Sequence, residues 1–552
     1  MNIWPLERVS LKTLKSEDDE LAAKCGCTPI VAALLRIKYG FGRGDILRAR
    51  EWLNPSLKSA LLSLEYTEEE KEAANVWQRN KGAARVAVYG DYDVDGVCAT
   101  TLAVEMALKS FLSVRYFIPH RHEQGYGVHK SIIRDLARDR CNLLIVVDCG
   151  TRDIEALSEA AKAGIDVLVF DHHAPGDALP EEAIVVNPHV TGSPESKTLC
   201  ATGVLWKWAV KSRIFDPKWL ISKLDLVALA TIADSMPLGL LNRALVKAGI
   251  NVLRKQTRGG LAALAGEMRL NVNVIDEEDL SMRVIPALNA AGRLDLAELS
   301  VKVLLGHDNV KTYVQKLVAL NRRRQYLSSN LLEELWPLIE RGEHVVCDEK
   351  WPAGVLSGVA SRLCSETGKA IALAAPVGKV IRGTLRVPKG SDALQVLTEV
   401  APYLEAWGGH KFAAGFSVDA KKWDELKERM DNILKGIEPS FEELEVLDIS
   451  PSCLSLNEVL QIKQLGPFGV GNPAPLFFAK RESPLELLPL GKDGRHFRVK
   501  SGENSYIAFN GASSKDIIID SYGWIYRPKI NYWRGNVKVD MLLDRVVVSQ
   551  CE

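Results

Sequence analysis

Three short apolar runs in the first half of the chain each end in acidic residues or histidines. Residues 85–90 lead into Asp91-Tyr92-Asp93-Val94-Asp95-Gly96, residues 143–147 into Asp148-Cys149-Gly150, and residues 166–170 into Asp171-His172-His173. Each run has the length and apolar content of a buried strand, and the segments between the runs are long enough to hold helices. Strands that alternate with helices favour a parallel sheet.

The polar ends of these runs predict a metal site. In a parallel α/β sheet, sites form beyond the carboxyl ends of the strands, so the three ends should gather at one edge. The five carboxylates and two imidazoles there would repel one another or titrate abnormally unless cations lay among them. Carboxylates with a few imidazoles suit Mg²⁺ or Mn²⁺, and the histidines favour Mn²⁺.

Within this cluster, Asp93 and Asp95 lie two residues apart in a predicted loop, which Asp91 and the flexible Gly96 complete. Both carboxylates can therefore face one or two ions. Asp148, at the end of a central strand, is well placed to bridge two cations about 3.5–4 Å apart, the arrangement that stabilises attacking and leaving oxygens in phosphoryl displacement. The alternative is that each aspartate caps the helix that follows its strand, a common role in α/β proteins.

The rest of the chain divides by pattern, because 552 residues exceed what one hydrophobic core usually holds. Residues 1–70 are expected to form a helical, locally basic appendage, and residues 71–309 an α/β part with a helical extension. Residues 310–343 have the apolar stripe of a long connecting helix. A second, smaller α/β pattern covers residues 344–438. The short strands, turn glycines and prolines of residues 439–552 predict a small antiparallel barrel.

Composition adds one constraint on partners. Lys plus Arg equals Asp plus Glu at 70 each, so nucleic-acid binding would have to rest on local patches. The C-terminal region offers such patches, in which aromatic side chains could stack bases while cations follow the backbone; they comprise Lys492, Arg495, His496, Arg498, Lys500, Trp524, Tyr526, Arg527, Lys529, Tyr532, Trp533, Arg534 and Lys538.

We see no signal peptide and no apolar stretch of the ~18 residues that a membrane span needs, which predicts a cytoplasmic protein.

Several of these segments resemble the signatures of a known family, the DHH phosphoesterases. Residues 90–96, 147–150 and 171–173 are similar to its first three signatures, and Ala230-Thr231-Ile232-Ala233-Asp234 is similar to the fourth. Residues 408–416 resemble the signature of the DHH-associated domain. Residues 118–121, 125–127 and 285–293, with Gly466-Pro467-Phe468-Gly469-Val470-Gly471-Asn472-Pro473 at the start of an oligonucleotide-binding (OB) fold, narrow the resemblance to the RecJ branch.

This resemblance implies an assignment for individual side chains. Two Mn²⁺ or Mg²⁺ ions would be held by Asp93, Asp95, Asp148, His172 and Asp234, with Asp91 as a contributor. His173 would contact the scissile phosphate or orient the ligands, and counts with them among the catalytic residues; a structural histidine is the alternative.

The resemblance also implies substrate contacts from Arg293, Arg386, Gly408, Gly409 and His410. A salt bridge at a domain interface is the alternative for Arg293, and a packed side chain is the alternative for His410. One segment departs from the family pattern: Gly383-Thr384-Leu385-Arg386-Val387 stands where these proteins tend to have Gly-Ser-x-Arg-Ser. Arg386 is retained, but the second hydroxyl is missing.

The activity implied by the resemblance is digestion of single-stranded DNA from 5′ to 3′ into 5′-mononucleotides, in DNA repair and recombination. A cleft between the catalytic and DHH-associated lobes would admit single strands and exclude duplexes. The family further implies a monomer, with a RecQ-type helicase and a single-strand binding protein as partners. Two alternatives stay open. One is a phosphodiesterase acting on short oligoribonucleotides, cyclic dinucleotides or pyrophosphate, although such enzymes generally lack the OB module. The other is a non-catalytic scaffold, although such relatives lose metal ligands.

Overall fold

The computed structural model describes residues 4–6, 9–82, 85–121, 125–255, 258–306, 308–438, 444–491, 494–533 and 536–548. The chain forms two compact units. One comprises Pro55–Leu327 with Pro467–Pro473, and the other comprises Met1–Asn54, Ser328–Gly466 and Ala474–Glu552. The division falls within the long helix α18 (Val310–Glu340). Among the described helices, none is long and apolar enough to cross a membrane.

The first unit contains a five-stranded sheet in which every pairing is parallel. Its strands are β3 (Arg85–Tyr89), β4 (Ser113–Phe117), β5 (Leu143–Val147), β6 (Asp166–Phe170) and β7 (Ile184–Val186), in the order β4-β3-β5-β6-β7. The three predicted runs are therefore adjacent strands. All five residues of β5 are buried, as expected for a central strand covered on both faces.

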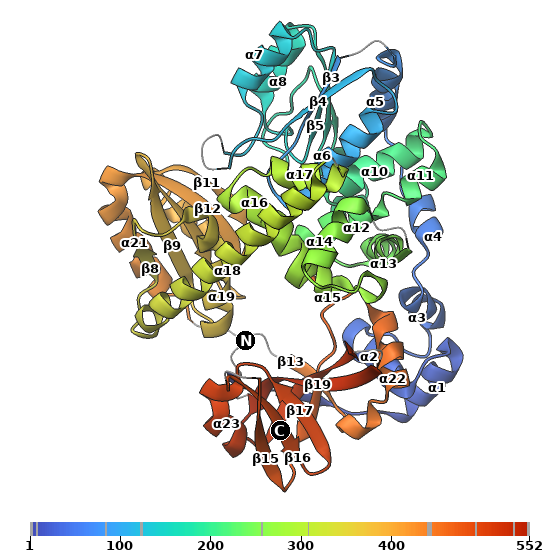
Figure 1. Cartoon of the computed structure of the whole chain (residues 1–552), viewed down its shortest axis with the longest axis vertical. Helices are drawn as coiled ribbons and strands as arrows, with labels where there is room; N and C mark the ends of the chain where they lie inside the picture. The colour runs from blue at the N-terminus through green and yellow to red at the C-terminus, as the bar shows by residue number, and fades with distance from the viewer. Residues whose placement is uncertain are drawn as a thin grey trace. The chain divides into compact units, whose positions relative to one another are not determined.

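Helices cover both faces of this sheet. One face packs against α7 (Lys130–Arg138) and α8 (Ile154–Lys162), and the other against a larger core that includes α6 (Val94–Ala107), α10 (Ala201–Ser212) and α12 (Leu224–Ala233) (Figure 1). The remaining helices of the unit are α4 (Leu57–Leu62), α5 (Glu68–Arg79), α9 (Pro188–Thr191), α11 (Pro217–Ile221), α13 (Leu240–Lys255), α14 (Gly259–Glu267), α15 (Glu277–Asp279), α16 (Ile285–Leu294) and α17 (Glu298–Leu305).

The strand order fixes where a site can form. The chain passes from β3 to β4 on one side and then returns to place β5 on the other side of β3. The connections leaving β3 and β5 thus diverge, which makes their carboxyl ends the switch point where doubly wound sheets bind ligands. The loops beginning at Asp91 and Asp148 start at this point.

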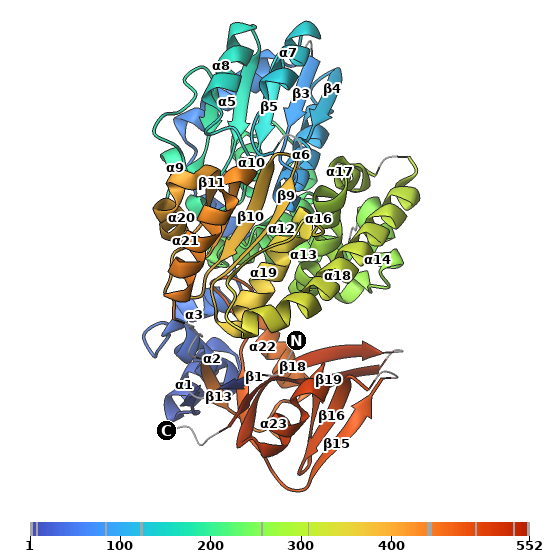
Figure 2. The same ribbon diagram turned by 90° about the vertical axis from the view of Figure 1, so that its left-hand side faces the viewer.

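The second unit contains a mixed five-stranded sheet in the order β11-β12-β10-β9-β8. Its strands are β8 (Val345–Cys347), β9 (Ile371–Val377), β10 (Val380–Arg386), β11 (Leu404–His410) and β12 (Ala413–Asp419). α20 (Ala393–Glu399) and α21 (Trp423–Lys435) share the apolar core on one face, and α19 (Ala353–Thr367) packs on β9 and β10 (Figure 2). β11 forms one edge of the sheet.

The C-terminal sheet consists mainly of antiparallel hairpins, in the order β15-β16-β17-β19-β18-β14-β13-β2. From residue 444 onward its strands are β13 (Leu444–Asp448), β14 (Phe477–Lys480), β15 (Leu485–Leu490), β16 (His496–Ser501), β17 (Asn504–Ala508), β18 (Gly523–Trp533) and β19 (Asn536–Val547), with α22 (Leu456–Ile462) and α23 (Lys515–Asp520) between them. The antiparallel pairs agree with the predicted barrel style, and parallel pairs join β17 to β19 and β13 to β14.

The N-terminal region completes this sheet. β2 (Val9–Lys12) pairs with β13 and β1 (Trp4–Leu6) pairs with β19, both in parallel, while α1 (Ser16–Cys25), α2 (Pro29–Tyr39) and α3 (Ile46–Leu53) follow. The sequence predicted only helices here. Both strands are too short to show a period of two, and their partners lie more than four hundred residues along the chain, so no local pattern could indicate them.

Candidate metal centre and substrate-binding residues

Asp93 lies in a tight turn between β3 and α6. Its side chain caps α6, because Asp93 Oδ1 accepts a hydrogen bond from the Gly96 amide at 3.0 Å. A Cβ at Gly96 would lie 2.5 Å from the Asp91 carbonyl oxygen, so the turn requires glycine there. The capping role that sequence analysis left open is therefore real for Asp93, and it fixes the side chain in place without excluding a second role.

Asp95 is held by a different helix. Its carboxylate accepts hydrogen bonds from the Ala201 amide at 2.7 Å, the Thr202 amide at 2.9 Å and the Thr202 hydroxyl at 2.6 Å, all in the first turn of α10. These donors are otherwise unsatisfied at a helix N-terminus, so Asp95 supplies the cap from outside α10. The side chain is only 1% exposed.

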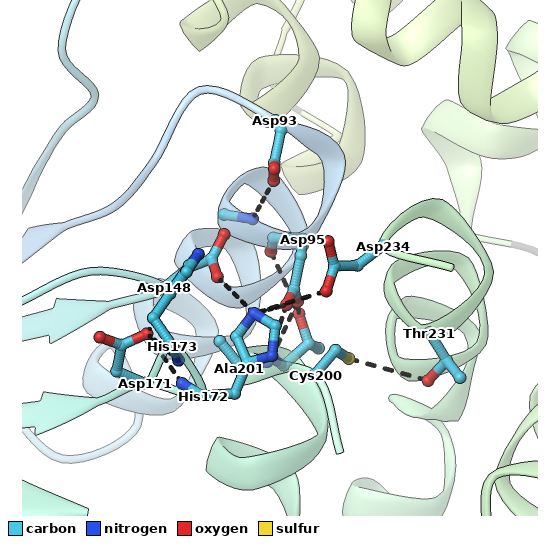
Figure 3. A network of polar contacts seen from close by, with 12 residues as sticks. Asp93, Asp95, Asp148, Asp171, His172, His173, Cys200, Ala201, Thr231 and Asp234 are labelled. Carbon is cyan, nitrogen blue, oxygen red and sulfur yellow. Dashed lines mark hydrogen bonds and ion pairs between the residues drawn. The ribbon is translucent and has the colours of Figure 1, made fainter. Parts of the chain in front are cut away.

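Asp148 and His172 bring the other strand ends to the same place. Asp148 follows β5 in a left-handed conformation (φ +61°), a strained geometry that is typical of functional turns. The Nε2 atom of His172 lies 3.4 Å from Asp148 Oδ1, 3.8 Å from Asp95 Oδ2 and 3.5 Å from Asp234 Oδ2. Figure 3 shows these three carboxylates around the His172 ring. Asp234, from the end of α12, thus joins a site built by the sheet.

The potential ligand atoms form overlapping sets within 4.8 Å. One set is Asp91, Asp93 and Asp148; another is Asp95, His172 and Asp234; a third joins Asp148 with His172 and His173. Asp148 belongs to two of them, as expected for a residue between two neighbouring cation positions. Buried oxygens of Asp91 and Asp148 (Oδ1 in each) have no hydrogen-bond donor among the described residues. Carboxylate oxygens with an imidazole suit Mn²⁺ and Mg²⁺, so the residues present fit two such ions.

The electrostatics show the same need for positive charge. Burial, followed by the charges of the neighbouring aspartates, raises the pKa of Asp148 well above its usual value. The pKa of Asp91 is raised in the same way, by burial and then by Asp93. Burial and the charges of Asp95 and Asp93 raise the pKa of Asp234 to about 8. Bound cations would offset this repulsion and lower the pKa of all three carboxyl groups.

His173 is part of a separate, neutralised pair. Its Nδ1 lies 2.7 Å from Asp171 Oδ1 and 3.1 Å from the Tyr126 hydroxyl. Burial opposes protonation, but the Asp171 carboxylate outweighs it and raises the pKa of His173 to about 9. Asp171 also accepts hydrogen bonds from the His172 and His173 amides. Asp171 therefore orients the histidine pair and holds a positive charge beside the metal ligands.

Models of three protein families match the chain. The DHH family, N-terminal domain, matches residues 85–231, the DHHA1 domain residues 342–436, and the RecJ OB domain residues 447–545. The "Single-stranded-DNA-specific exonuclease RecJ" of Thermus thermophilus is 35% identical over 461 residues, which cover 82% of this chain and 67% of that protein. The Escherichia coli protein of the same name is 28% identical over 93% of this chain and 95% of its own length. The chain belongs to the RecJ family.

Solved structures of the RecJ family agree with this. The structure of T. thermophilus RecJ in complex with Mn²⁺ matches with a TM-score of 0.80 and 28% identity, over 100% of this chain and 80% of that one. The same protein with Mg²⁺ matches with a TM-score of 0.73 and 27% identity, over 100% and 79%. The carboxylate and imidazole groups gathered in this chain are of the types that these two ions bind.

Among the predicted substrate contacts, Arg293 lies outside the carboxylate cluster but on a helix that packs against it. Arg293 is half-buried in α16, and a Cβ at the preceding Gly292 would lie 2.5 Å from the Tyr92 carbonyl oxygen. The loop of Asp91 to Asp95 and the helix of Arg293 are therefore in direct contact.

The structure brings His410 and Arg386 into one row of the smaller α/β sheet. Both residues pair with Ala413 of β12, His410 from β11 and Arg386 from β10, so their side chains leave the same face. Gly409 has φ +147°, and a Cβ there would lie 2.5 Å from the Ala413 carbonyl oxygen, whereas a Cβ at Gly408 would meet open space. Gly409 is thus required by the hairpin itself, and Gly408 leaves an open approach to the backbone.

The segment that departs from the family pattern still fixes its arginine. Arg386 donates to the Thr384 hydroxyl at 2.7 Å and, through Nε, to the Ser361 hydroxyl at 2.8 Å. Val387, which stands at the position of the missing hydroxyl, is buried in the core of this sheet. Thr384 therefore supplies one contact that orients Arg386, while residue 387 contributes only packing.

The C-terminal basic and aromatic residues divide into core and surface. Trp524 and Tyr526 are fully buried, whereas Tyr532 is 44% exposed and Lys529 and Lys538 are exposed. Lys492, Arg534 and the side chain of Trp533 lie outside the described residues.

Sequence reasoning missed several side chains that support the site. Tyr126 contacts His173, Thr202 binds Asp95, and Asn187 donates to the His173 carbonyl oxygen at 2.9 Å. Arg121 lies over the Tyr92 ring at 4.8 Å and its charge acts on Asp91. Tyr126 and Arg121 lie in segments that carried the family resemblance, which was the available signal. Thr202 and Asn187 gave none, because their contacts depend on the fold.

Proposed function

We propose that this chain is an exonuclease that hydrolyses single-stranded DNA with two divalent cations. The observation that carries the proposal is the meeting of Asp91, Asp93, Asp95, Asp148, Asp234 and His172 at the switch point of a parallel sheet. The family supports the substrate, since the named relatives are single-stranded-DNA-specific exonucleases and the chain matches the RecJ OB domain.

Two adjacent cation positions account for the ligand sets. Asp91, Asp93 and Asp148 would hold one ion, and Asp95, His172 and Asp234 would hold the other, with Asp148 shared between them. When bound, such a pair of ions lowers the pKa of a water molecule and neutralises charge that develops on the phosphate. The third set supports this arrangement, because it shares Asp148 with the first set and His172 with the second.

The protein's own groups complete the chemistry. His173, kept protonated by Asp171, places a positive charge where it can bind a non-bridging phosphate oxygen or donate a proton to the leaving oxygen. The hydrogen bonds of Asp95 to α10 and of Asp93 to Gly96 fix two carboxylates before any substrate binds. Such preorganisation lowers the cost of positioning the reacting phosphate.

Substrate contacts would come from Arg293, from Arg386 and from the edge strand β11, which carries Gly408 and His410. Arg386 and His410, in one row of the sheet, suit two phosphate oxygens of a strand that crosses the open backbone at Gly408. Arg293, on the helix that packs against the metal loop, suits a phosphate near the scissile bond. Exposed Tyr532, Lys529 and Lys538 suit stacking and backbone contacts farther along the strand.

We extend the proposal to direction, domains and partners. The resemblance described above implies digestion from 5′ to 3′ into 5′-mononucleotides in repair and recombination, a monomeric state, and a RecQ-type helicase and single-strand binding protein as partners. The division at residues 70, 309, 343 and 438 and a cytoplasmic location are the predictions made from the sequence patterns. The match of residues 85–231, 342–436 and 447–545 to three family models supports the domain division.

One experiment tests substrate, direction and cofactor together. Single strands labelled at either the 5′ or the 3′ end, matching duplexes, and a dinucleotide are digested with EDTA, Mg²⁺ or Mn²⁺. We expect metal-dependent release of the 5′ label as a mononucleotide from single strands and little from duplexes. Preferential turnover of the dinucleotide would favour the oligoribonucleotide alternative, and equal activity of an Asp148→Ala variant would exclude catalysis by the carboxylate cluster.

A further inference from the structure

A turn from the C-terminal part of the sequence packs against the chain just after Asp234. The Val470 carbonyl oxygen accepts a hydrogen bond from the Leu238 amide at 2.8 Å, and a Cβ at Gly469 would lie 2.9 Å from Leu238 Cδ1. Leu238 is 2% exposed. We call residues 467–473 the glycine turn. They belong to the same compact unit as Asp234, although the strands on either side of them in sequence belong to the C-terminal sheet.

The glycine turn is internally fixed. Gly469 and Asn472 exchange backbone hydrogen bonds of 2.9 and 3.0 Å, and the Asn472 side chain donates to the Pro467 carbonyl oxygen at 2.8 Å. Gly471, at φ +73°, supplies the positive φ that the third residue of a type II turn requires. The Phe468 amide donates to Glu277 Oε1 at 2.9 Å, which ties the turn to α15. The turn therefore presents a preformed surface to Leu238.

The segment that it contacts has a strained start. α12 ends in a Schellman motif, in which the Met236 amide donates to the Thr231 carbonyl oxygen and the Ser235 amide to that of Ile232. Ser235 occupies, at φ +54°, the left-handed position that usually takes glycine. Such a conformation persists when the surroundings hold it. Asp234 is the residue immediately before this position, and its Oδ2 lies 3.5 Å from His172 Nε2.

We infer that the glycine turn is a positioning element for Asp234: it holds residues 235–238 and thereby sets where this carboxylate lies in the metal centre. The inference rests on the proposed role of Asp234 as a metal ligand. Because the turn is continuous in sequence with α22 on one side and β14 on the other, a segment of the nucleic-acid-binding part contacts the chain that carries a metal ligand. Gly469, Val470 and Gly471 are positioning residues, since none of them reaches the centre.

The test compares two glycines with the same backbone conformation. Gly471→Ala adds a methyl group 3.5 Å from the Leu238 amide nitrogen at φ +73°, whereas Gly306→Ala adds one at φ +72° with nothing within 4 Å. Both full-length variants should lose a similar amount of thermal stability. Free Mn²⁺ is titrated by electron paramagnetic resonance in the absence of DNA. We expect Gly471→Ala to weaken Mn²⁺ binding by about tenfold or more, as for other residues that orient metal ligands, and Gly306→Ala to leave it unchanged.

A double-mutant comparison identifies the residue through which the turn acts. In an Asp234→Ala background, Gly471→Ala should have no further effect on Mn²⁺ binding. If Gly471→Ala does not fold, Gly469→Ala, whose added methyl group would lie 2.9 Å from Cδ1 of the buried Leu238, takes its place with the same expectation. Mn²⁺ affinity equal to that of Gly306→Ala, or a full effect that persists without Asp234, would overturn the inference. Failure of the proposed exonuclease function would instead appear as normal Mn²⁺ binding without digestion of strands.

Discussion

Neutralising Asp148 should stabilise the metal-free protein while abolishing its activity. Asp148 is buried, one of its oxygens lacks a hydrogen bond, and its ligand oxygen lies within 4.8 Å of those of Asp91 and Asp93. In Asp148→Asn the shape of the side chain is retained and the charge is removed. The repulsion that raises the pKa of Asp148 is then lost from the folded state, whereas the unfolded chain is barely affected.

The size of the effect follows from these distances. Two unit charges 4.8 Å apart repel by about 3 kcal/mol at an effective dielectric constant near 20. Protons that bind to the raised carboxyl groups already relieve part of this repulsion, so we expect a gain of roughly 1–3 kcal/mol at pH 8. For a unit of this size that corresponds to a rise of roughly 2–5 °C in the melting temperature.

Metal should reverse the order of stability. Wild type binds cations only when folded, so a concentration of Mn²⁺ one hundred times the dissociation constant adds about 2.7 kcal/mol. Asp148→Asn lacks the shared ligand and should gain much less. Calorimetric melting of both proteins in EDTA and in Mn²⁺ at pH 8, with strand digestion measured in parallel, tests both halves of the expectation.

Asp225→Asn is the matched control. Asp225 is as buried as Asp148, but its carboxylate accepts hydrogen bonds from Arg258 at 2.8 and 3.2 Å. The same substitution should therefore destabilise the protein by about 1–3 kcal/mol, because it removes one of the two carboxylates that pair with the buried Arg258 guanidinium, the other being Glu105 at 2.7 Å. If Asp148→Asn melts below wild type in EDTA, as this control should, the carboxylate cluster does not destabilise the metal-free fold, and cations are not needed to relieve its repulsion.

Three further outcomes are expected. The pKa of Asp234 is about 8 in the folded state and near 4 in the unfolded chain, so the folded state holds a proton that unfolding releases. The melting temperature of the metal-free protein should therefore fall as the pH rises from about 4 to 8. A flat profile of melting temperature against pH in EDTA would contradict this. Binding isotherms at several salt concentrations give the slope of log affinity against log salt concentration. Lys529→Ala and Lys538→Ala should each reduce the magnitude of this slope by about one. Tyr532→Ala should instead weaken strand binding by about 1–3 kcal/mol and leave the slope unchanged. His410→Ala should raise KM for strands several-fold without changing the Mn²⁺ concentration that half-activates the enzyme; a shift in that concentration would place His410 in the metal centre.

Sequence patterns predicted the catalytic sheet because its signals are local. The runs ending at Asp91, Asp148 and Asp171 are strands whose strong apolar character decides their structure within five residues. The rule that parallel strands share a polar edge then brings their ends together without further knowledge of the fold. Asp234 could not be placed in this way, since it ends a helix more than sixty residues later and joins the site only through the packing of α12.

The same limit explains what sequence reasoning missed. β1 and β2 are strands only because partners in β19 and β13 supply their hydrogen bonds. A deletion beyond residue 440 would remove β13 and β19 and so leave β1 and β2 unpaired. Point substitutions of exposed residues in the C-terminal sheet are therefore the better test of DNA binding. The glycine turn gave a strong family signal, but its contact with Leu238 appears only in three dimensions.

The capping and metal-binding interpretations of the aspartates prove to be complementary. Asp95 lies at the N-terminus of α10, where the helix dipole and two amides compensate part of its charge without any ion. Asp148 Oδ1 is buried without a hydrogen bond among the described residues, and its nearest cationic group would be His172, whose Nε2 lies 3.4 Å away. The centre therefore combines a carboxylate that the fold keeps in position with one that the fold leaves unsatisfied. Fixed ligands reduce the cost of ordering the site, and the unsatisfied one supplies the affinity that draws cations into it.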